Sequence, residues 1–217
     1  MNRLSLPDRE NGRPLRILCL GAHSDDIEIG CGGAILRLRE SEAVEIQWVV
    51  FSATGERGEE AKTSAEKFAG ISNLRAIDLK AFRDGFLPYD GARVKDTFEE
   101  LKVAFSPDLI FTHTSKDAHQ DHRLVCELTW NTFRDHLILE YEIPKYDGDL
   151  GQPNVFVPLS AEISRRKVDY LMDVFATQRQ KRWFRAETFE AMMRLRGMEC
   201  NAAEGLAEAF YCRKMTL

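Results

Sequence analysis

The segment LRILCLGAHSDDIEIGCGG, residues 15–33, joins a short, mainly apolar run to a group of polar residues and a glycine-rich stretch. Its first part, LRILCLGA (15–22), has the pattern of a strand that is buried on both faces. The part that follows, IEIGCGGAILRLRE (27–40), carries apolar residues at helical spacing. The segment therefore predicts a buried strand, then a turn that holds one histidine and two adjacent aspartates, and then a helix.

The rest of the chain repeats this order of elements. Strand-like runs cover 44–53, 75–80 and 107–113, and helical patterns cover 58–70, 93–105 and 121–136. A strand followed by a helix, repeated in this way, predicts a mainly parallel sheet with helices on both faces. The last third predicts two strands, at 137–143 and 154–159, and two helices, at 161–176 and 186–197. We therefore expect one α/β domain over residues 1–217, with residues 1–13 as a flexible extension.

Composition and charge narrow the range of functions. The 217 residues are 44% hydrophobic and 30% charged, which suits one domain with a substantial core. The net charge of −5 disfavours a nucleic-acid partner, since phosphate binding needs a basic surface. We expect no signal peptide and no membrane span, because the N-terminus is polar and no apolar run approaches about 18 residues. Five scattered cysteines without a C-x-x-C pair favour reduced thiols in a cytoplasmic protein.

Two polar motifs directly follow predicted strands. The first is HSDD, residues 23–26, and the second is HTSKDAHQDH, residues 113–122. Together they hold four of the five histidines in the chain. In a parallel sheet, ligands bind outside the carboxyl ends of the strands. We therefore expect the two motifs to form one site.

The side chains of these motifs suit a divalent metal. Zinc in hydrolytic sites takes three nitrogen or oxygen ligands and keeps one position open for water. His23 and Asp26 are three residues apart and can face one point, and a histidine of the second motif would complete the set. Asp25 would remain free to take a proton from water, while a further histidine could polarise a carbonyl. We expect the glycine-rich stretch to let backbone approach backbone closely behind the metal.

Spacing alone leaves alternatives open. It does not separate His119 from His122, and it does not exclude His113 as the third ligand. Asp25 or Asp26 could instead cap the helix that follows. Two histidines and one carboxylate also describe a non-haem iron oxygenase, although repeated strand–helix units disfavour that class. The stretch GCGG lacks the G-x-G-x-x-G fingerprint of dinucleotide binding.

The two motifs resemble those of a known family. The sequence AHSDDIEIGCGG is similar to the motif A-H-P-D-D followed by GCGG, and DAHQDH (117–122) is similar to H-x-D-H preceded by an aspartate. Weaker similarity extends to SATGERGEEA (52–61) and AEAF (207–210). On these residues the chain resembles the LmbE-like, or PIG-L, deacetylases. Ser24 and Gln120 stand where that family usually has proline, so we expect looser loops and unchanged chemistry.

The resemblance implies a Rossmann-like three-layer α/β sandwich and a zinc-dependent amidohydrolase. Such an enzyme removes an acetyl group from an N-acetylated amino sugar or glycoconjugate, and Fe²⁺ or another divalent metal could replace Zn²⁺. A hydrolase of another amide and a non-catalytic sugar-binding relative are the alternatives. Assembly into a homo-oligomer is compatible with the resemblance. The aromatic loop 82–91 could line the sugar site or serve ordinary packing.

The resemblance also implies roles for individual residues. The positions that match the metal ligands of the family are His23, Asp26 and His122. Asp25 matches the general base, and His119 matches the group that stabilises the oxyanion. Asp121 matches the partner that orients His119. Arg57 is a candidate for binding a substrate hydroxyl or phosphate, and a surface ion pair with Glu60 is the simpler alternative.

Overall fold

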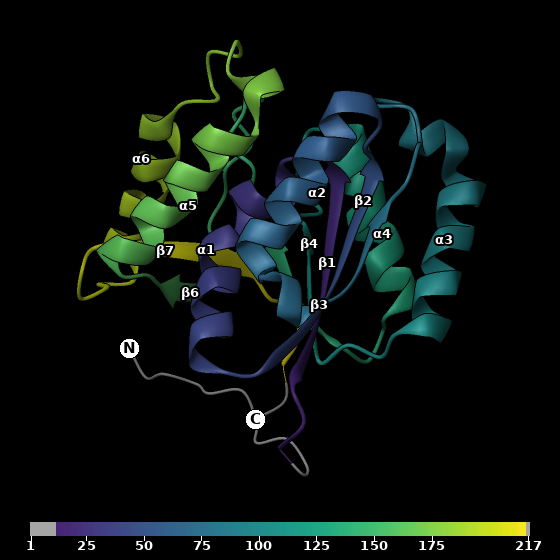
Figure 1. Cartoon of the computed structure of the whole chain (residues 1–217), viewed down its shortest axis with the longest axis horizontal. Coiled ribbons are helices and arrows are strands. Elements are labelled where there is room, and N and C mark those ends of the chain that lie inside the picture. The colour runs from purple at the N-terminus through teal and green to yellow at the C-terminus, as the bar shows by residue number, and fades with distance from the viewer. Residues whose placement is uncertain (1–11, 216–217) are drawn as a thin grey trace.

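The computed structural model describes residues 12–215, and their strands form a seven-stranded sheet in the order β3-β2-β1-β4-β5-β7-β6 (Figure 1). The strands are β1 (Leu15–His23), β2 (Val44–Ser52), β3 (Leu74–Leu79), β4 (Leu109–His113), β5 (Leu137–Tyr141), β6 (Val155–Pro158) and β7 (Ala207–Tyr211). Strands β1 to β5 pair in parallel, whereas β7 runs antiparallel to β5 and β6. The predicted mainly parallel sheet is confirmed.

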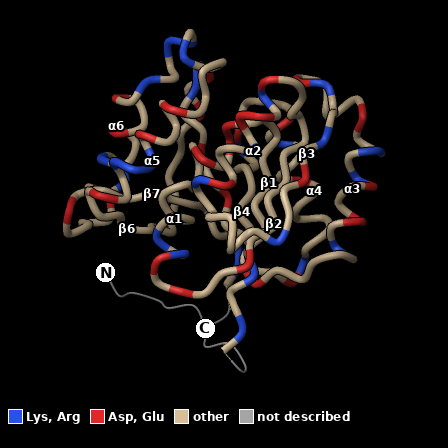
Figure 2. Tube along the Cα trace, viewed as in Figure 1, with Lys and Arg blue, Asp and Glu red and all other residues tan. Residues whose placement is uncertain are grey.

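Helices cover both faces of this sheet (Figure 1). They are α1 (Asp26–Ser41), α2 (Gly55–Ala69), α3 (Gly91–Ala104), α4 (Gln120–Thr132), α5 (Ala161–Val174) and α6 (Ala186–Glu199). Helices α1, α2, α5 and α6 pack on one face, and α3 and α4 pack on the other. Acidic and basic residues are interspersed along the helices and loops (Figure 2). The three-layer α/β architecture is therefore as the sequence predicted.

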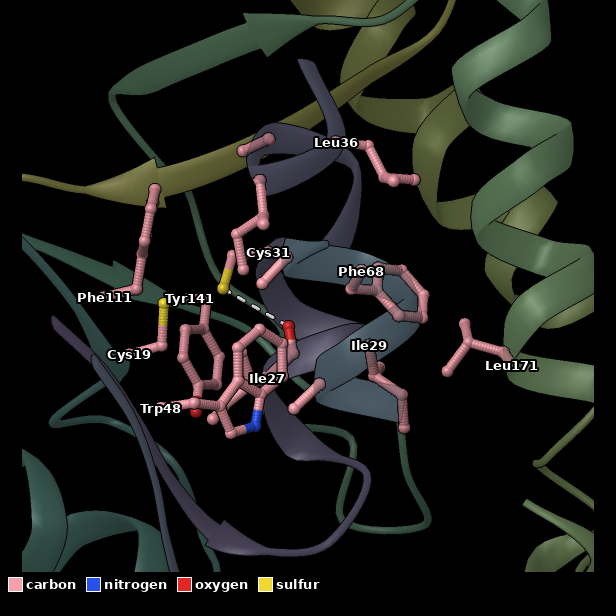
Figure 3. Close-up of a cluster of buried hydrophobic side chains, with 14 of the residues drawn as sticks. Cys19, Ile27, Ile29, Cys31, Leu36, Trp48, Phe68, Phe111, Tyr141 and Leu171 are labelled. Atoms are coloured by element: carbon pink, nitrogen blue, oxygen red, sulfur yellow. Dashed lines mark hydrogen bonds between the residues drawn. The ribbon is translucent and has the colours of Figure 1, made fainter. Parts of the chain in front are cut away.

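Strand β1 is buried on both faces because successive side chains point to opposite sides of the sheet. Ile17 and Cys19 join the apolar cluster under α1 and α2. Leu18 and Leu20 join the cluster under α3 and α4. Figure 3 shows the first cluster, in which Trp48 and other large side chains lie between the sheet and the helices. Such a strand reads as a continuous apolar run, which explains the pattern of residues 15–22.

The strand order places a topological switch point between β1 and β4. From β1 the chain moves outward to β2 and β3, then returns to β4 on the other side of β1 and continues to β5. The connections after β1 and after β4 therefore diverge and leave a crevice at the carboxyl ends of these two strands. The two polar motifs begin at His23 and His113, the last residues of those strands.

The strand β7 was not predicted from the sequence. Its residues AEAFY form a short segment that pairs with two strands distant in sequence, β5 and β6. Glu208 in this strand would ordinarily indicate a solvent-facing position. It is instead 4% exposed, because its carboxylate lies 2.5 Å from Lys167 Nζ and accepts hydrogen bonds from Gly33 and Ala34 N–H, both at 2.7 Å. Because Lys167 compensates the charge of Glu208, this buried strand contains an acidic residue, and its sequence does not show the apolar pattern of a buried strand.

The glycine-rich start of α1 serves side-chain packing and not the close approach of backbones. A Cβ atom on Gly30 would lie 2.2 Å from the Tyr141 ring, and one on Gly32 would lie 2.5 Å from the Phe68 ring. Both rings are fully buried against α1 (Figure 3). The expectation that these glycines bring backbones together behind the site is therefore wrong, and large aromatic side chains take that space.

The start of the described chain is held to the segment just before the central strand β4. Of the expected flexible extension 1–13, residues 1–11 lie outside the described residues. The guanidinium of Arg13 donates two hydrogen bonds of 2.7 Å to the Asp108 carboxylate, just before β4. Within residues 12–215, no helix is long and apolar enough to cross a membrane.

Candidate metal centre

The loop after β1 is organised by a local contact. The Asp26 carboxylate accepts a 2.7 Å hydrogen bond from the backbone N–H of His23, which closes a turn of four residues. Asp25 occupies the N-cap position of α1, yet its side chain makes no capping hydrogen bond. The capping alternative therefore does not explain Asp25, whose buried carboxylate is left available for chemistry.

The side chains of the three predicted metal ligands, His23, Asp26 and His122, lie close together. His23 Nδ1 lies 3.1 Å from His122 Nε2 and 3.3 Å from Asp26 Oδ2. His122 Nε2 lies 3.5 Å from Asp26 Oδ2. Two ligands of a tetrahedral zinc ion, each about 2.0–2.1 Å from the metal, are about 3.4 Å apart. The triangle formed by these three residues therefore has the size that a tetrahedral divalent metal requires.

The electrostatic surroundings of His23 favour a cation. Its Nε2 atom lies 3.1 Å from Asp84 Oδ1 and 3.3 Å from Asp121 Oδ2, on the side away from the triangle. Burial opposes the charged form, but the carboxylates of Asp26, Asp121 and Asp84 together raise the pKa of His23 well above its usual value. The same negative potential would stabilise a metal ion that takes the place of this proton.

His122 has a carboxylate partner on its second ring nitrogen. Its Nδ1 atom lies 2.9 Å from Asp117 Oδ2, so that Nε2 is directed into the triangle. Asp117 is 2% exposed. Although burial opposes it, the hydrogen bond and charge of His122 hold the pKa of Asp117 well below its usual range. A carboxylate that fixes the ring of a ligating histidine is a recurrent feature of metal sites.

His113 also lies at the centre, although spacing did not assign it a role. Its Nε2 atom accepts a 3.0 Å hydrogen bond from the backbone N–H of Ala22 and lies 3.2 Å from Asp26 Oδ2. The ring stacks on His122, with centroids 3.9 Å apart. Asp26, His113 and His122 thus form a second group of the right size for a metal. Because Nε2 is already engaged by a backbone N–H, His113 suits the support of the ligands better than ligation.

Asp25 lies beside the triangle with Arg57 as its nearest cation. Burial, and then the charge of Asp26, raise the pKa of Asp25, while Arg57 partly offsets them. The guanidinium Nη2 of Arg57 lies 3.9 Å from Asp25 Oδ1, and its Nη1 donates a 2.7 Å hydrogen bond to Asp84. A raised pKa makes Asp25 a stronger proton acceptor than an ordinary aspartate.

The alternative partner of Arg57 is engaged elsewhere. Glu60 is buried, and its carboxylate accepts hydrogen bonds from the backbone N–H of Thr177 at 2.9 Å and from its hydroxyl at 2.6 Å. The R-x-x-E spacing therefore does not reflect a surface ion pair. Arg57 is instead directed toward the candidate centre through Asp84 and Asp25.

His119 and Asp121 make contacts that differ from the expected ones. The ring atom Nδ1 of His119 accepts a 3.2 Å hydrogen bond from the backbone N–H of Asp121. The Asp121 carboxylate accepts hydrogen bonds from Gly85 N–H at 2.8 Å and from Leu87 N–H at 3.1 Å. The backbone of Asp121 thus orients His119, while its side chain holds the 85–87 turn against the centre.

Asp84 is a site residue that sequence reasoning missed. It belongs to the loop 82–91, which also presents two adjacent aromatic rings, Phe86 and Tyr89, with centroids 5.5 Å apart. Tyr89 is 76% exposed. The aromatic residues drew attention to this loop, but nothing in its local sequence distinguishes Asp84 from an ordinary loop aspartate. Contacts with other segments bring it to His23, namely the hydrogen bonds from Gly85 and Leu87 to Asp121 and the one from Arg57 to Asp84 itself.

Comparison with known proteins defines the class of this chain. Residues 18–133, which span β1 to the end of α4 and include both motifs, match the family described as PIG-L: GlcNAc-PI de-N-acetylase. The chain belongs to this PIG-L, or LmbE-like, family, as its motifs predicted.

Individual relatives agree with this membership. The chain is 29% identical over 138 residues to a protein of Escherichia coli strain K12 named "uncharacterized deacetylase YaiS", covering 59% of this chain and 74% of that protein. An N,N'-diacetylchitobiose deacetylase of Pyrococcus horikoshii has a similar structure, with a TM-score of 0.71 and 20% identity over 94% of this chain and 86% of that one.

The same fold also occurs in a protein with a different named reaction. GalB of Pseudomonas putida KT2440, a 4-carboxy-2-hydroxymuconate hydratase, matches with a TM-score of 0.69 and 18% identity, covering 94% of this chain and 98% of its own. At this identity the structural likeness shows the fold alone. The reaction must therefore be argued from the site.

Proposed function

We propose that the protein is a metal-dependent hydrolase that removes the acetyl group from an N-acetylated amino sugar or glycoconjugate. The observation that carries this proposal is the triangle of His23 Nδ1, Asp26 Oδ2 and His122 Nε2, with sides of 3.1, 3.3 and 3.5 Å. Zn²⁺ suits this ligand set, and Fe²⁺ is the closest competitor because the same residues accept both. When bound, the ion would act as a Lewis acid and would make water more acidic.

Asp25 is the base in this proposal. Its carboxylate is adjacent to the Asp26 ligand, is 4% exposed and has a raised pKa. It would accept the proton of the attacking water and return it to the departing amine. The Arg57 guanidinium, 3.9 Å away, partly offsets the effects that raise this pKa and so favours the ionised form that can accept a proton.

His119 is the oxyanion donor in this proposal. Because its Nδ1 atom accepts the N–H of Asp121, the ring proton of a neutral His119 lies on Nε2. Burial, and then the charges of His122 and His23, lower the pKa of His119, which keeps the ring neutral near pH 7. Nε2–H can therefore donate a hydrogen bond to the carbonyl oxygen as negative charge develops there.

The surroundings of the site support a sugar substrate. Phe86 and Tyr89 are exposed, at 37% and 76%, on the loop that carries Asp84. Exposed aromatic rings beside a polar centre offer an apolar face against which a sugar ring can pack. A non-catalytic sugar-binding protein would not need a buried carboxylate with a raised pKa next to the ligand set. A hydrolase of another amide remains the alternative, and cytoplasmic location and a homo-oligomer stay predictions from the sequence.

The test is a metal-and-turnover comparison of wild type with Asp25→Asn. Both proteins are stripped with a chelator, reloaded with Zn²⁺ or Fe²⁺, and assayed for amine release from a panel of N-acetylated sugars. We expect about one metal per chain in both proteins and amine release in wild type alone. Metal binding without amine release from any sugar would move the proposal to another amide, and the absence of metal binding would overturn it.

A further inference from the structure

The loop between β5 and β6, residues 142–154, sends a charged side chain toward the metal centre. The Lys145 side chain is only 9% exposed, and its ammonium lies between two carboxylates. It is 2.9 Å from Asp117 Oδ1 and 2.5 Å from Asp149 Oδ2. Neither the metal motifs nor the family resemblance assigned a role to Lys145 or Asp149.

Asp117 links this ammonium to the candidate ligands. Its Oδ2 atom holds the ring of His122 through Nδ1 at 2.9 Å, on the side opposite the triangle. Its Oδ1 atom accepts the backbone N–H of His119 at 2.8 Å as well as the Lys145 ammonium. One buried carboxylate therefore fixes two of the three histidines of the second motif, His119 and His122, and the Lys145 ammonium pairs with it.

Asp149 is the second carboxylate that contacts the Lys145 ammonium. Its Oδ2 atom accepts the backbone N–H of Ala118 at 2.7 Å in addition to the Lys145 ammonium. The three consecutive residues 117–119 are thus tied to the 142–154 loop through one lysine and one aspartate. Without the ammonium, the buried Asp117 carboxylate and the partly buried Asp149 carboxylate would lie close together without this cation, which is unfavourable.

We propose that Lys145 is a positioning residue of the metal centre, holding Asp117 so that His122 Nε2 stays directed at Asp26 and His23. Asp149 supports the same role by fixing Lys145 and the Ala118 backbone. This inference rests on the proposed metal site, but it concerns how tightly the site binds its ion. It makes the metal affinity of the second motif depend on a residue more than twenty positions away along the chain.

The test measures Zn²⁺ affinity by chelator competition and the visible spectrum of the Co²⁺-loaded protein, whose bands report ligand geometry. The variants are Lys145→Met, Lys145→Arg, Asp117→Asn and the double variant Lys145→Met/Asp117→Asn. Lys67→Met is the matched control, because Lys67 pairs with Asp173 on helices α2 and α5 outside the centre. Thermal unfolding of each metal-free variant reports general stability.

We expect Lys145→Met to bind Zn²⁺ about tenfold more weakly, at the lower end of the roughly 10–100-fold loss typical of partners of metal ligands. Its Co²⁺ spectrum should change, and Lys145→Arg should restore most of the affinity because it retains the charge. The double variant should bind no more weakly than Asp117→Asn, since Lys145 acts through Asp117. Lys67→Met should match wild type.

Unchanged affinity and spectrum in Lys145→Met would overturn the inference, and so would fully additive losses in the double variant. If Lys145→Met does not fold, Asp149→Asn provides the same test. We expect its Zn²⁺ affinity to fall by about threefold, less than the effect of removing Lys145, because the Lys145 ammonium is then held less firmly. Wild-type affinity in Asp149→Asn would then overturn the inference. Failure of wild type to bind Zn²⁺ or Co²⁺ would instead overturn the proposed function itself.

Discussion

The two loops that build the candidate centre are held in different ways. The loop after β1 is closed by its own residues, since the Asp26 carboxylate accepts the N–H of His23 three positions earlier. The loop after β4 has local hydrogen bonds too, from the N–H of His119 to Asp117 and from the N–H of Asp121 to His119, but it also depends on distant segments. Lys145 holds Asp117, and the Asp121 carboxylate accepts the N–H groups of Gly85 and Leu87. A hydrogen bond between residues three positions apart can be expected from their spacing in the sequence. Contacts between distant segments form only when the fold brings those segments together.

The largest effect should come from removing a candidate ligand from either loop. We expect His23→Ala and His122→Ala both to lose Zn²⁺ affinity by more than the roughly 10–100-fold attributed to partners of ligands, and to lose amine release with it. Metal content after dialysis measures this directly. Retention of one zinc per chain by either variant would remove that histidine from the ligand set and would point to His113 in its place.

Removal of the base should separate binding from turnover. Asp25→Asn retains the size and hydrogen-bonding capacity of the side chain but cannot accept a proton. We expect kcat to fall by about 10²–10⁴-fold, the usual contribution of general acid–base catalysis, with Zn²⁺ content unchanged. Steady-state kinetics with metal analysis on the same samples checks this. Near-native turnover would assign the base to another residue.

Asp121→Asn distinguishes the two roles of Asp121. If the side chain mainly holds the 85–87 turn, the variant at full Zn²⁺ loading should raise KM by about tenfold, by weakening one charge-assisted hydrogen bond, and leave kcat nearly unchanged. Metal content is measured on the same samples, because Asp121 Oδ2 also lies 3.3 Å from Nε2 of the candidate ligand His23. If the carboxylate instead oriented His119, as the family resemblance implied, kcat would fall and KM would stay constant. Whether KM or kcat changes therefore decides whether the Asp121 side chain holds the 85–87 turn or orients His119.

The smallest expected effect on activity lies behind the first loop, at Glu28 in α1, where the predicted change is in stability. This side chain is fully buried, and neither carboxylate oxygen has a hydrogen-bond partner among the described residues. Burial raises the pKa of Glu28 well above its usual 4.5, so the folded protein binds a proton that the unfolded chain releases. The contribution of Glu28 to stability is therefore fully present below pH 4.5 and is lost as the pH rises through the folded pKa, by up to about 1.4 kcal/mol per pH unit.

Glu28→Gln should remove this pH dependence. The variant should match wild type near pH 4 and exceed its free energy of unfolding at pH 8, because no charge is forced into the core. Denaturant unfolding of the metal-free proteins at the two pH values measures the difference. Equal free energies of unfolding for wild type and Glu28→Gln at pH 8 would show that water or a rearrangement reaches the carboxylate.

Much of the fold could be predicted from the sequence, because the spacing of apolar residues shows which side chains are buried. The run at 15–22 is apolar because both faces of β1 are covered, and the helix α3 shows its buried stripe through Val94, Phe98 and Leu101. Strand β7 could not be predicted, since the charge of its buried Glu208 is compensated by Lys167, which lies in another element. Likewise, the glycines of α1 were explained only by the Tyr141 and Phe68 rings that pack against them.

By itself, the sequence determined the mainly parallel α/β architecture, membership of the PIG-L family, and the two motifs that meet at the switch point. Those features follow from local spacing and from the alternation of strand and helix. Only the tertiary structure decided that Asp84 and Lys145 lie at the centre, how His113 contacts Asp26, and that Asp121 faces Gly85 and Leu87. The physical reason is that a buried charge takes its partner from whichever segment the fold brings near, and the spacing of residues along the chain carries no record of that segment.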